Sequence, residues 1–435
     1  MDDLKNKRVT VAGLGRFGGA IAAAQWLCRQ GARVLVTDKT PADKLRESIL
    51  QLDGYPVEFR LGEHRVEDFT GADLVVASPA LSPQNEYLLA ARASGVPVTT
   101  EIRIFLELCP LPVVAISGTK GKSTTSTLLT HMLQTKYRCW LGGNIGRSLL
   151  PDLPMMRQGE IVLLELSSFM LHYLGQSRWH PHVALLTMLG SDHLDWHQTQ
   201  QAYLAAKRNI VEFQTRGDFA ILGEDSAIAR DFALHTKAQK LWYGTKGRKR
   251  FEMQIPGEHN QLNAQAAFAA ASCLGVDWNS AQEAILEVEG LPHRLQLVHE
   301  WQGRRFYDDS IATIAEAAAA ALRSFPQGKV IQIVGGKDKG LPFEVMCDAL
   351  AEHAKAALCI GAAGPKIASL IRQRHPAFQG VRELQTLEKA MHQAREMAQP
   401  GDVILLAPGC SSYDQFDNFE KRGDEFTRLA RAIFV

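Results

Sequence analysis

Short apolar runs alternate with longer amphipathic stretches through most of the 435 residues. Apolar runs closed by glycine or a polar residue are typical of buried strands, and apolar positions spaced at helical period are typical of helices. The apolar runs lie at residues 8–12, 32–38, 113–117, 161–166, 183–187, 329–336, 357–361 and 402–407, and helical runs at 20–29 and 201–212. This alternation predicts α/β domains built on mainly parallel sheets.

The alternation divides into three blocks. The first closes where Pro110 and Pro112 follow a short helical stretch, and the second closes near residues 291–295. We therefore expect three domains, at residues 1–99, 100–296 and 297–435. Each has a glycine-rich strand end. Ligands of open α/β sheets bind at the carboxyl ends of strands, so the three domains could serve one shared cleft.

Composition narrows the classes of partner. The chain has 48 basic and 47 acidic residues, a net charge of +1, which leaves no electrostatic footprint for nucleic acid. The seven cysteines are scattered without a Cys-x-x-Cys pair, which argues against a disulfide framework or a zinc site. No secretory signal and no apolar run long enough for a membrane span is seen, so we expect a cytoplasmic protein with no membrane insertion.

A strand, a glycine turn and a helical pattern follow one another at residues 113–129. Gly118 and Gly121 supply a turn whose backbone amides can cradle phosphate, Lys122 can reach the β/γ-phosphates, and the Ser123 hydroxyl can bind Mg²⁺. A strict phosphate loop would have glycine at Ile116, so the match is to the shorter Gly-x-x-Gly-Lys-Ser form. The sequence predicts that the middle domain binds ATP.

A second glycine-rich turn occupies residues 13–18, after the first strand. Asp38 ends the next strand about 20 residues later, which is the spacing of a dinucleotide-binding fingerprint. Taken alone this favours NAD and an oxidoreductase. The rest of the chain has no clear hydride-transfer site, so we interpret the first domain as a Rossmann-like βαβ unit that accepts a nucleotide.

Further motifs follow the phosphate loop in order, at residues 141–146, 164–169, 191–197, 205–207, 259–263, 291–294, 308–313 and 407–423. The ordered series resembles the Mur ligases of peptidoglycan synthesis over nearly the whole chain. The run 414–423 is most similar to the member that joins D-glutamate to UDP-N-acetylmuramoyl-L-alanine. The resemblance implies three domains, the third also Rossmann-like, and a monomer. It also implies that ATP phosphorylates a substrate carboxylate and that the amino acid's amine attacks the resulting acyl phosphate.

The resemblance also assigns roles to residues. Catalysis would rest on Lys122, His193 and Lys207, and two Mg²⁺ would be held by Ser123, Glu165, His193 and Lys207, the last as a carbamate. ATP would contact Gly118, Thr119, Lys120, Gly121, Lys122, Ser123, Thr124, Asn260, Asn263, Arg294 and Asp309. The UDP substrate would contact Leu14, Gly15, Asp38, Lys39, Ser78, Asn144 and His193, and glutamate would contact Thr313, Lys339, Ser412 and Phe419.

Two observations test these expectations. His193 and His197 have the spacing of a zinc protease helix, but Leu194 stands where that motif needs glutamate, so we reject zinc hydrolysis. Ile311 and Ile314 replace a lysine and an asparagine that are usual in the family. The acceptor could therefore be L-glutamate or another amino acid, and a non-catalytic nucleotide-binding regulator is a further alternative.

Overall fold

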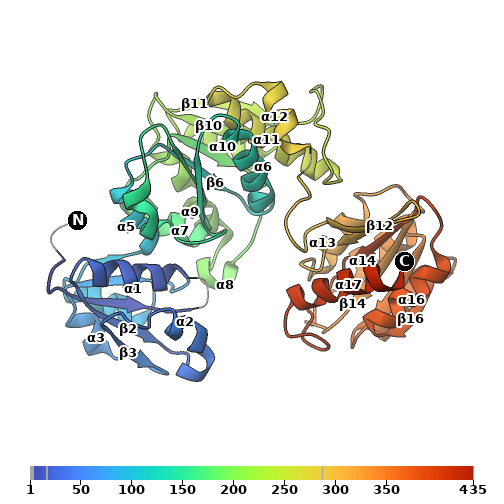
Figure 1. The fold of residues 1–435 in the computed structure, drawn as a ribbon, viewed down its shortest axis with the longest axis horizontal. Helices are drawn as coiled ribbons and strands as arrows, with labels where there is room; N and C mark the ends of the chain where they lie inside the picture. Colours follow the sequence, from blue (N-terminus) through green and yellow to red (C-terminus); the bar gives the residue numbers. More distant parts are fainter. Residues whose placement is uncertain (1–3, 16–17, 287, 435) are drawn as a thin grey trace. The chain divides into compact units, whose positions relative to one another are not determined.

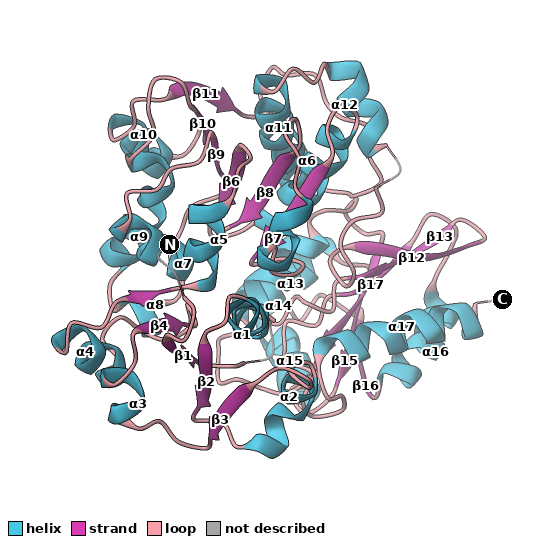
Figure 2. Cartoon of the chain, turned by 60° about the vertical axis from the view of Figure 1, so that its left-hand side comes forward, coloured by secondary structure: helices cyan, strands magenta, loops and turns pink. Residues whose placement is uncertain are grey.

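The computed structural model describes residues 4–15, 18–286 and 288–434. Arg16 and Phe17, within the glycine-rich turn of the first domain, lie outside this part of the chain. The described residues form three sheets covered by helices (Figures 1 and 2), and the expected three-domain α/β fold with mainly parallel sheets is confirmed. By their contacts the residues divide into two compact units: 1–248 with 263–281, and 249–262 with 282–435.

The first sheet has the order β3-β2-β1-β4-β5, and all of its pairings are parallel. Its strands are β1 (Arg8–Ala12), β2 (Arg33–Asp38), β3 (Val57–Leu61), β4 (Leu74–Ala77) and β5 (Val98–Thr99). Its helices are α1 (Gly19–Arg29), η1 (Ala42–Leu45), α2 (Arg46–Leu50), α3 (Val66–Thr70) and α4 (Glu86–Ala93). Because β1 is central and fully buried after Arg8, the glycine turn that follows it lies at the middle of the sheet's carboxyl edge.

The second sheet is also entirely parallel, in the order β11-β10-β9-β6-β8-β7. Its strands are β6 (Val113–Ser117), β7 (Cys139–Gly143), β8 (Ile161–Glu165), β9 (Val183–Leu186), β10 (Phe219–Gly223) and β11 (Gln239–Tyr243). Its helices are α5 (Glu101–Leu108), α6 (Lys122–Gln134), η2 (Leu150–Met155), α7 (Ser168–Gln176), α8 (Leu194–His197), α9 (Gln200–Glu212) and α10 (Ala227–Leu234). The chain continues in α11 (Glu258–Cys273) and α12 (Trp278–Ile285).

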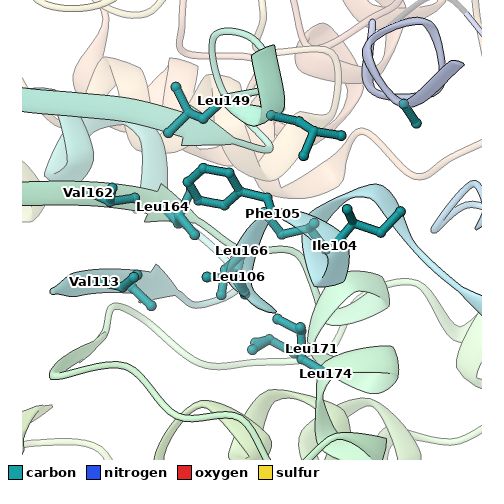
Figure 3. Packing of buried hydrophobic residues seen from close by; sticks show 14 of the residues in the cluster. Ile104, Phe105, Leu106, Val113, Leu149, Val162, Leu164, Leu166, Leu171 and Leu174 are labelled. Carbon is teal, nitrogen blue, oxygen red and sulfur yellow. The ribbon is translucent and has the colours of Figure 1, made fainter. Parts of the chain in front are cut away.

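Burial explains why the central strands of this sheet read as unbroken apolar runs. Every residue of β6, β8 and β9 is buried, as expected for parallel strands covered by helices on both faces. Figure 3 shows Phe105 of α5 packed among Leu149, Val162 and Leu164. The apolar core fixes the strands, and the loops at their carboxyl ends are left to carry polar groups.

The third sheet has the order β12-β13-β17-β14-β15-β16. The pair β12–β13 is antiparallel and the other pairings are parallel, so this sheet is mixed. Its strands are β12 (Gln296–Trp301), β13 (Arg304–Asp308), β14 (Val330–Gly335), β15 (Ala356–Ile360), β16 (Val381–Gln385) and β17 (Val403–Leu406). Its helices are α13 (Ala315–Leu322), α14 (Glu344–His353), α15 (Gly364–Arg374), α16 (Leu387–Met397) and α17 (Phe419–Ile433).

Alternation along the third sheet's strands builds a three-layer domain. Val330 and Val334 of β14 belong to the core shared with α13, α14 and α15. Ile331 and Ile333 of the same strand belong to the core shared with α16 and α17. Helices therefore cover both faces, and only the loops at the sheet's edges are available for a ligand.

Candidate active site

The middle sheet brings three polar loops together. Strand β6 lies between β8 and β9, and all three run in the same direction, so their carboxyl ends meet at one edge. The loop 118–121 follows β6, Glu165 ends β8, and residues 187–193 follow β9. These are the positions at which an open α/β sheet binds its ligand.

The loop 118–121 has the geometry of a phosphate cradle. Gly118 and Gly121 adopt φ angles of 154° and 87°, which residues with a Cβ rarely adopt. Gly121 caps the N-terminus of α6, and it has no side chain to accept hydrogen bonds from the amides of the first turn. A helix N-terminus of this kind attracts an anion. Ser123 is half-buried and Thr124 buried in that first turn, and Lys120 is exposed on the loop.

Two lysines approach the same loop. Lys122 Nζ donates to the carbonyl oxygens of Gly118 and Thr119, each at 3.1 Å. Lys207 Nζ, from α9, donates to the Gly118 carbonyl at 2.7 Å and to Ser117 Oγ at 3.3 Å. Lys207 is only 2% exposed. Its burial, with a further contribution from the positive charge of Lys122, lowers its pKa from 10.5 to about 7.

Glu165 is buried, and only one of its two carboxylate oxygens accepts a hydrogen bond from the described residues. Its Oε1 accepts a hydrogen bond from Asn144 Nδ2 at 2.8 Å, and the Asn144 amide donates to the Glu165 carbonyl at 2.7 Å. Oε2 is buried and accepts no hydrogen bond from the residues that the structure describes. A buried polar oxygen without a partner is costly, and a bound cation would satisfy it. Asn144, which the resemblance assigns to the UDP substrate, lies against a predicted metal ligand.

The two histidines of the 191–197 motif have different surroundings. His193 is about half exposed, with a left-handed φ of 52°, and its ring lies 4.8 Å from that of Phe169. His197 is buried, its Nε2 lies 2.9 Å from Ser168 Oγ, and burial is the main reason that its pKa falls to about 4. The helix between them spans only residues 194–197. His193 is therefore available to a ligand, and His197 packs inside the domain.

Tyr203, which the sequence analysis did not single out, ties the loop 118–121 to α9. Thr119 Oγ1 lies 2.9 Å from Tyr203 Oη and accepts from the Gly190 amide at 2.9 Å. The Tyr203 ring also lies 4.9 Å from Lys207 Nζ. Tyr203 stands four residues before Lys207, so the two share a helix face. That spacing could have identified Tyr203 as a neighbour of Lys207.

The residues expected to bind UDP come from three neighbouring strand ends of the first sheet. Leu14 and Gly15 follow β1, Asp38 and Lys39 lie at the end of β2, and Ser78 follows β4. Asp38 accepts from the amides of Thr40 and Gly15. Leu14 is 2% exposed, so it lines the inner wall of this edge and offers almost no surface. Lys39 is exposed, and its Nζ lies 5.0 Å from the centre of the Tyr87 ring.

The remaining residues expected near ATP lie in both units. Asn263, in the first unit, lies against the phosphate loop: a Cβ on Gly121 would be 2.5 Å from its Oδ1. Asn260, in the second unit, is buried and donates to the Pro256 carbonyl at 2.7 Å. Asp309 is also buried, accepts from the Leu295 amide at 3.1 Å, and has a neighbour in Arg294. Burial raises the pKa of Asp309 to about 8.

The residues expected to bind glutamate gather at the third sheet in the same way. Strands β13, β17 and β14 are neighbours, and the loops after them carry Thr313, Ser412 and Lys339. Lys339 is exposed and donates to the Thr313 carbonyl at 3.3 Å. Ser412 is buried, and Phe419 opens α17.

Comparison with known proteins identifies the family. Three family models match: "Mur ligase MurD-like, N-terminal domain" at residues 7–100, "Mur ligase middle domain" at 116–251 and "Mur ligase, glutamate ligase domain" at 293–410. The UDP-N-acetylmuramoylalanine–D-glutamate ligase of Roseiflexus sp. strain RS-1 is 38% identical, with 99% of each chain covered. The chain belongs to the Mur ligase family.

Other relatives of this Mur ligase support the assignment. The UDP-N-acetylmuramoylalanine–D-glutamate ligase of Acetivibrio thermocellus is 34% identical over 99% of this chain and 97% of its own. The crystal structure of MurF ligase from Thermotoga maritima in complex with ADP shares the fold, with 18% identity, 99% and 96% of the two chains covered and a TM-score of 0.58. Family membership makes the chain an ATP-dependent ligase, as expected from its sequence.

The site residues of this Mur ligase fit Mg²⁺. A buried carboxylate oxygen of Glu165 lacks a partner among the described residues, and hard oxygen ligands of that type suit Mg²⁺. The described residues contain no cluster of three or more His, Cys, Asp or Glu placed to hold a metal, and the expected ligand set includes a serine and a lysine instead. In the part of the chain that the structure describes, no helix combines the length and apolar character that crossing a membrane requires.

Proposed function

We propose that this Mur ligase joins D-glutamate to UDP-N-acetylmuramoyl-L-alanine at the expense of ATP, in the cytoplasm and as a monomer. The observation that carries the proposal is the convergence of a phosphate loop, a buried carboxylate and an accessible histidine on adjacent strand ends, in a chain whose relatives bear that activity in their names. Domains at 1–99, 100–296 and 297–435 would bind the UDP substrate, ATP and the amino acid.

In this proposal the chain's residues orient and neutralise the reactants. The amides of the α6 N-terminus and the ammonium of Lys122 hold the phosphates of ATP, so that the substrate carboxylate can attack the terminal phosphorus and ADP can leave. Ser123, Glu165, His193 and a carbamylated Lys207 would hold two Mg²⁺. When bound, these ions offset the negative charge that builds on the phosphate and carboxylate oxygens. The amine of glutamate then displaces phosphate from the acyl phosphate.

Water exclusion is the second task of the site, because an acyl phosphate hydrolyses when water reaches it. The floor of the predicted ATP site is closed to bulk solvent, since Ser117, Glu165 and Lys207 are all buried. Asn263 lies close to Gly121, where a built Cβ would be 2.5 Å from its Oδ1. The remaining cover would come from the substrates themselves.

The test measures phosphate release and product mass with ATP, Mg²⁺ and UDP-N-acetylmuramoyl-L-alanine. Parallel reactions contain D-glutamate, L-glutamate or no amino acid. Ligation with D-glutamate alone supports the proposal. Preference for L-glutamate would reject it and draw attention to Ile311 and Ile314, and no release with any acceptor would favour another substrate or a regulatory role.

A further inference from the structure

A fully buried arginine lies beneath the loops of the C-terminal sheet. Arg422, on α17, is 1% exposed. Its Nε donates to Ser310 Oγ at 3.0 Å, and its Nη2 donates to the carbonyls of Ser310 at 2.9 Å and Cys410 at 3.1 Å. One guanidinium thus joins the loop after β13, the loop after β17 and the helix that carries it.

The same side chain meets the loop after β14. A Cβ on Gly336 would lie 3.1 Å from Arg422 Nη1, and Gly336 has a φ of 137°. Glycine therefore permits the close approach of the Ser411 carbonyl oxygen, which would be nearest to such a Cβ, and then of the guanidinium. The Lys337 amide donates to the Ser411 carbonyl at 2.8 Å, which fastens the β14 loop to the β17 loop.

Ser310 extends the network to the start of α17. Its hydroxyl accepts from Arg422 and donates to the carbonyl of Phe419 at 2.8 Å. Asn418 caps the same helix end, where its side chain accepts from the Lys421 amide at 2.7 Å. The first turn of α17 is consequently held by its own cap and, through Ser310, by Arg422.

Burying this guanidinium has an energetic cost. Asp414 and Asp308 lie near enough to favour the charge of the guanidinium, but neither makes an ion pair with it, and Nη1 has no hydrogen-bond partner among the described residues. A buried charge that is not closely paired is expensive. Burial lowers the pKa of Arg422 to about 10, so it stays charged at neutral pH.

We infer that Arg422 is the positioning residue of the amino-acid acceptor site, because its contacts set the four segments that carry Thr313, Lys339, Ser412 and Phe419. This inference rests on the proposed function for the identity of those four residues as acceptor contacts.

The spacing along the chain supports the inference. Ser310 lies three residues before Thr313, and Cys410 two residues before Ser412. Phe419 lies one helical turn before Arg422 on α17. A shift of the guanidinium would therefore move these contacts together, and misplacement of about 1 Å is enough to damage a bound geometry.

The test uses full-length Arg422→Lys and Arg422→Gln. Lysine keeps the charge but cannot reproduce the fork of donors. With each substrate varied in turn, we expect KM for the amino acid to rise about tenfold or more, since several hydrogen bonds from a charged group are lost. The values for ATP and the UDP substrate should change less than about twofold in the same variants. Arg428→Lys is the matched control, because Arg428 lies on the same helix, is exposed and pairs with Glu425.

Parallel changes in all three KM values, or no change, would overturn the inference. A wild-type enzyme that ligates a different amino acid would reject the proposed acceptor alone, and the variants would then be tested with that amino acid. Hydrogen exchange gives a readout without turnover. Arg422→Gln should exchange faster in segments 309–313, 336–339 and 407–412, and unchanged exchange there would overturn the inference whatever the activity.

Discussion

The ammonium groups of Lys122 and Lys207 donate to one and the same carbonyl, that of Gly118. Two cations at one acceptor repel each other, and Lys207 is the buried member of the pair. Burial first, and then the repulsion from Lys122, explain why the pKa of Lys207 falls to about 7. An amine with that pKa is about half neutral at pH 7, whereas an ordinary lysine is almost entirely charged. Neutral amine is the form that can react with CO₂.

The carbamate proposal predicts the behaviour of Lys207→Ala. We expect this variant to lose nearly all ligase activity, because the buried cavity no longer holds an anionic oxygen. Short carboxylic acids such as acetate or propionate should restore part of the rate. Full activity without an additive, or no restoration with any carboxylate, would contradict the proposal.

Asn144 offers a test of the predicted metal site. Its hydrogen bond orients one oxygen of Glu165 and leaves the other free of partners among the described residues. Asn144→Ala should raise the Mg²⁺ concentration for half-maximal rate by roughly tenfold or more, as is typical when a partner of a metal ligand is removed. Asn209→Ala is a suitable control, since Asn209 bonds the Leu171 carbonyl instead. An unchanged Mg²⁺ dependence would remove Asn144 from the metal site.

The positions at which the buried strands end could be predicted from the sequence. Most contacts between the loops that follow those strands could not. The runs at 113–117, 161–166 and 183–187 predict buried strands, and the glycines identify the phosphate loop. Strand order is a tertiary property, however, so the adjacency of β8, β6 and β9 that brings Glu165 to the loop follows only from the folded sheet. The antiparallel strand β12 also has no marked signal, because its residues are mostly half-buried.

Buried polar networks were the least predictable feature. Tyr203 looks like an ordinary helix residue in the sequence, and Arg422 falls in the 414–423 motif without an assigned role. In the structure Tyr203 ties the 118–121 loop to α9, and Arg422 ties the loops after β13 and β17 to α17. A polar residue on a helix is usually solvated, so its burial becomes visible only when the partner loop is placed. The resemblance supplied individual residues such as Lys207, but it did not supply these ties.

The closeness of Gly121 to Asn263 predicts that a larger residue at position 121 weakens ATP binding. Gly121→Ala should raise KM for ATP by about tenfold, because the left-handed backbone strains alanine and the new Cβ would meet Asn263 Oδ1. Gly247→Ala is the matched control: Gly247 has a φ of 69° and no atom within 4 Å of a built Cβ. It introduces similar backbone strain without the collision. Equal effects of the two substitutions would show that the contact with Asn263 has no role.

The raised pKa of buried Asp309 predicts that the stability of the folded chain depends on pH. Its pKa rises from an ordinary 3.8 to about 8 in the folded chain, chiefly through burial. The folded state therefore binds more protons than the unfolded state between about pH 4 and 8, so the stability linked to this group is complete below pH 4 and is lost as the pH rises through 8. In wild type this group makes the unfolding free energy fall as the pH rises, by up to about 1.4 kcal/mol per pH unit. Asp309→Asn should remove this contribution to the slope. Urea unfolding at pH 5, 6.5 and 8 measures this, with the exposed Asp417→Asn as control. The same pH slope in wild type and Asp309→Asn would show that Asp309 ionises normally.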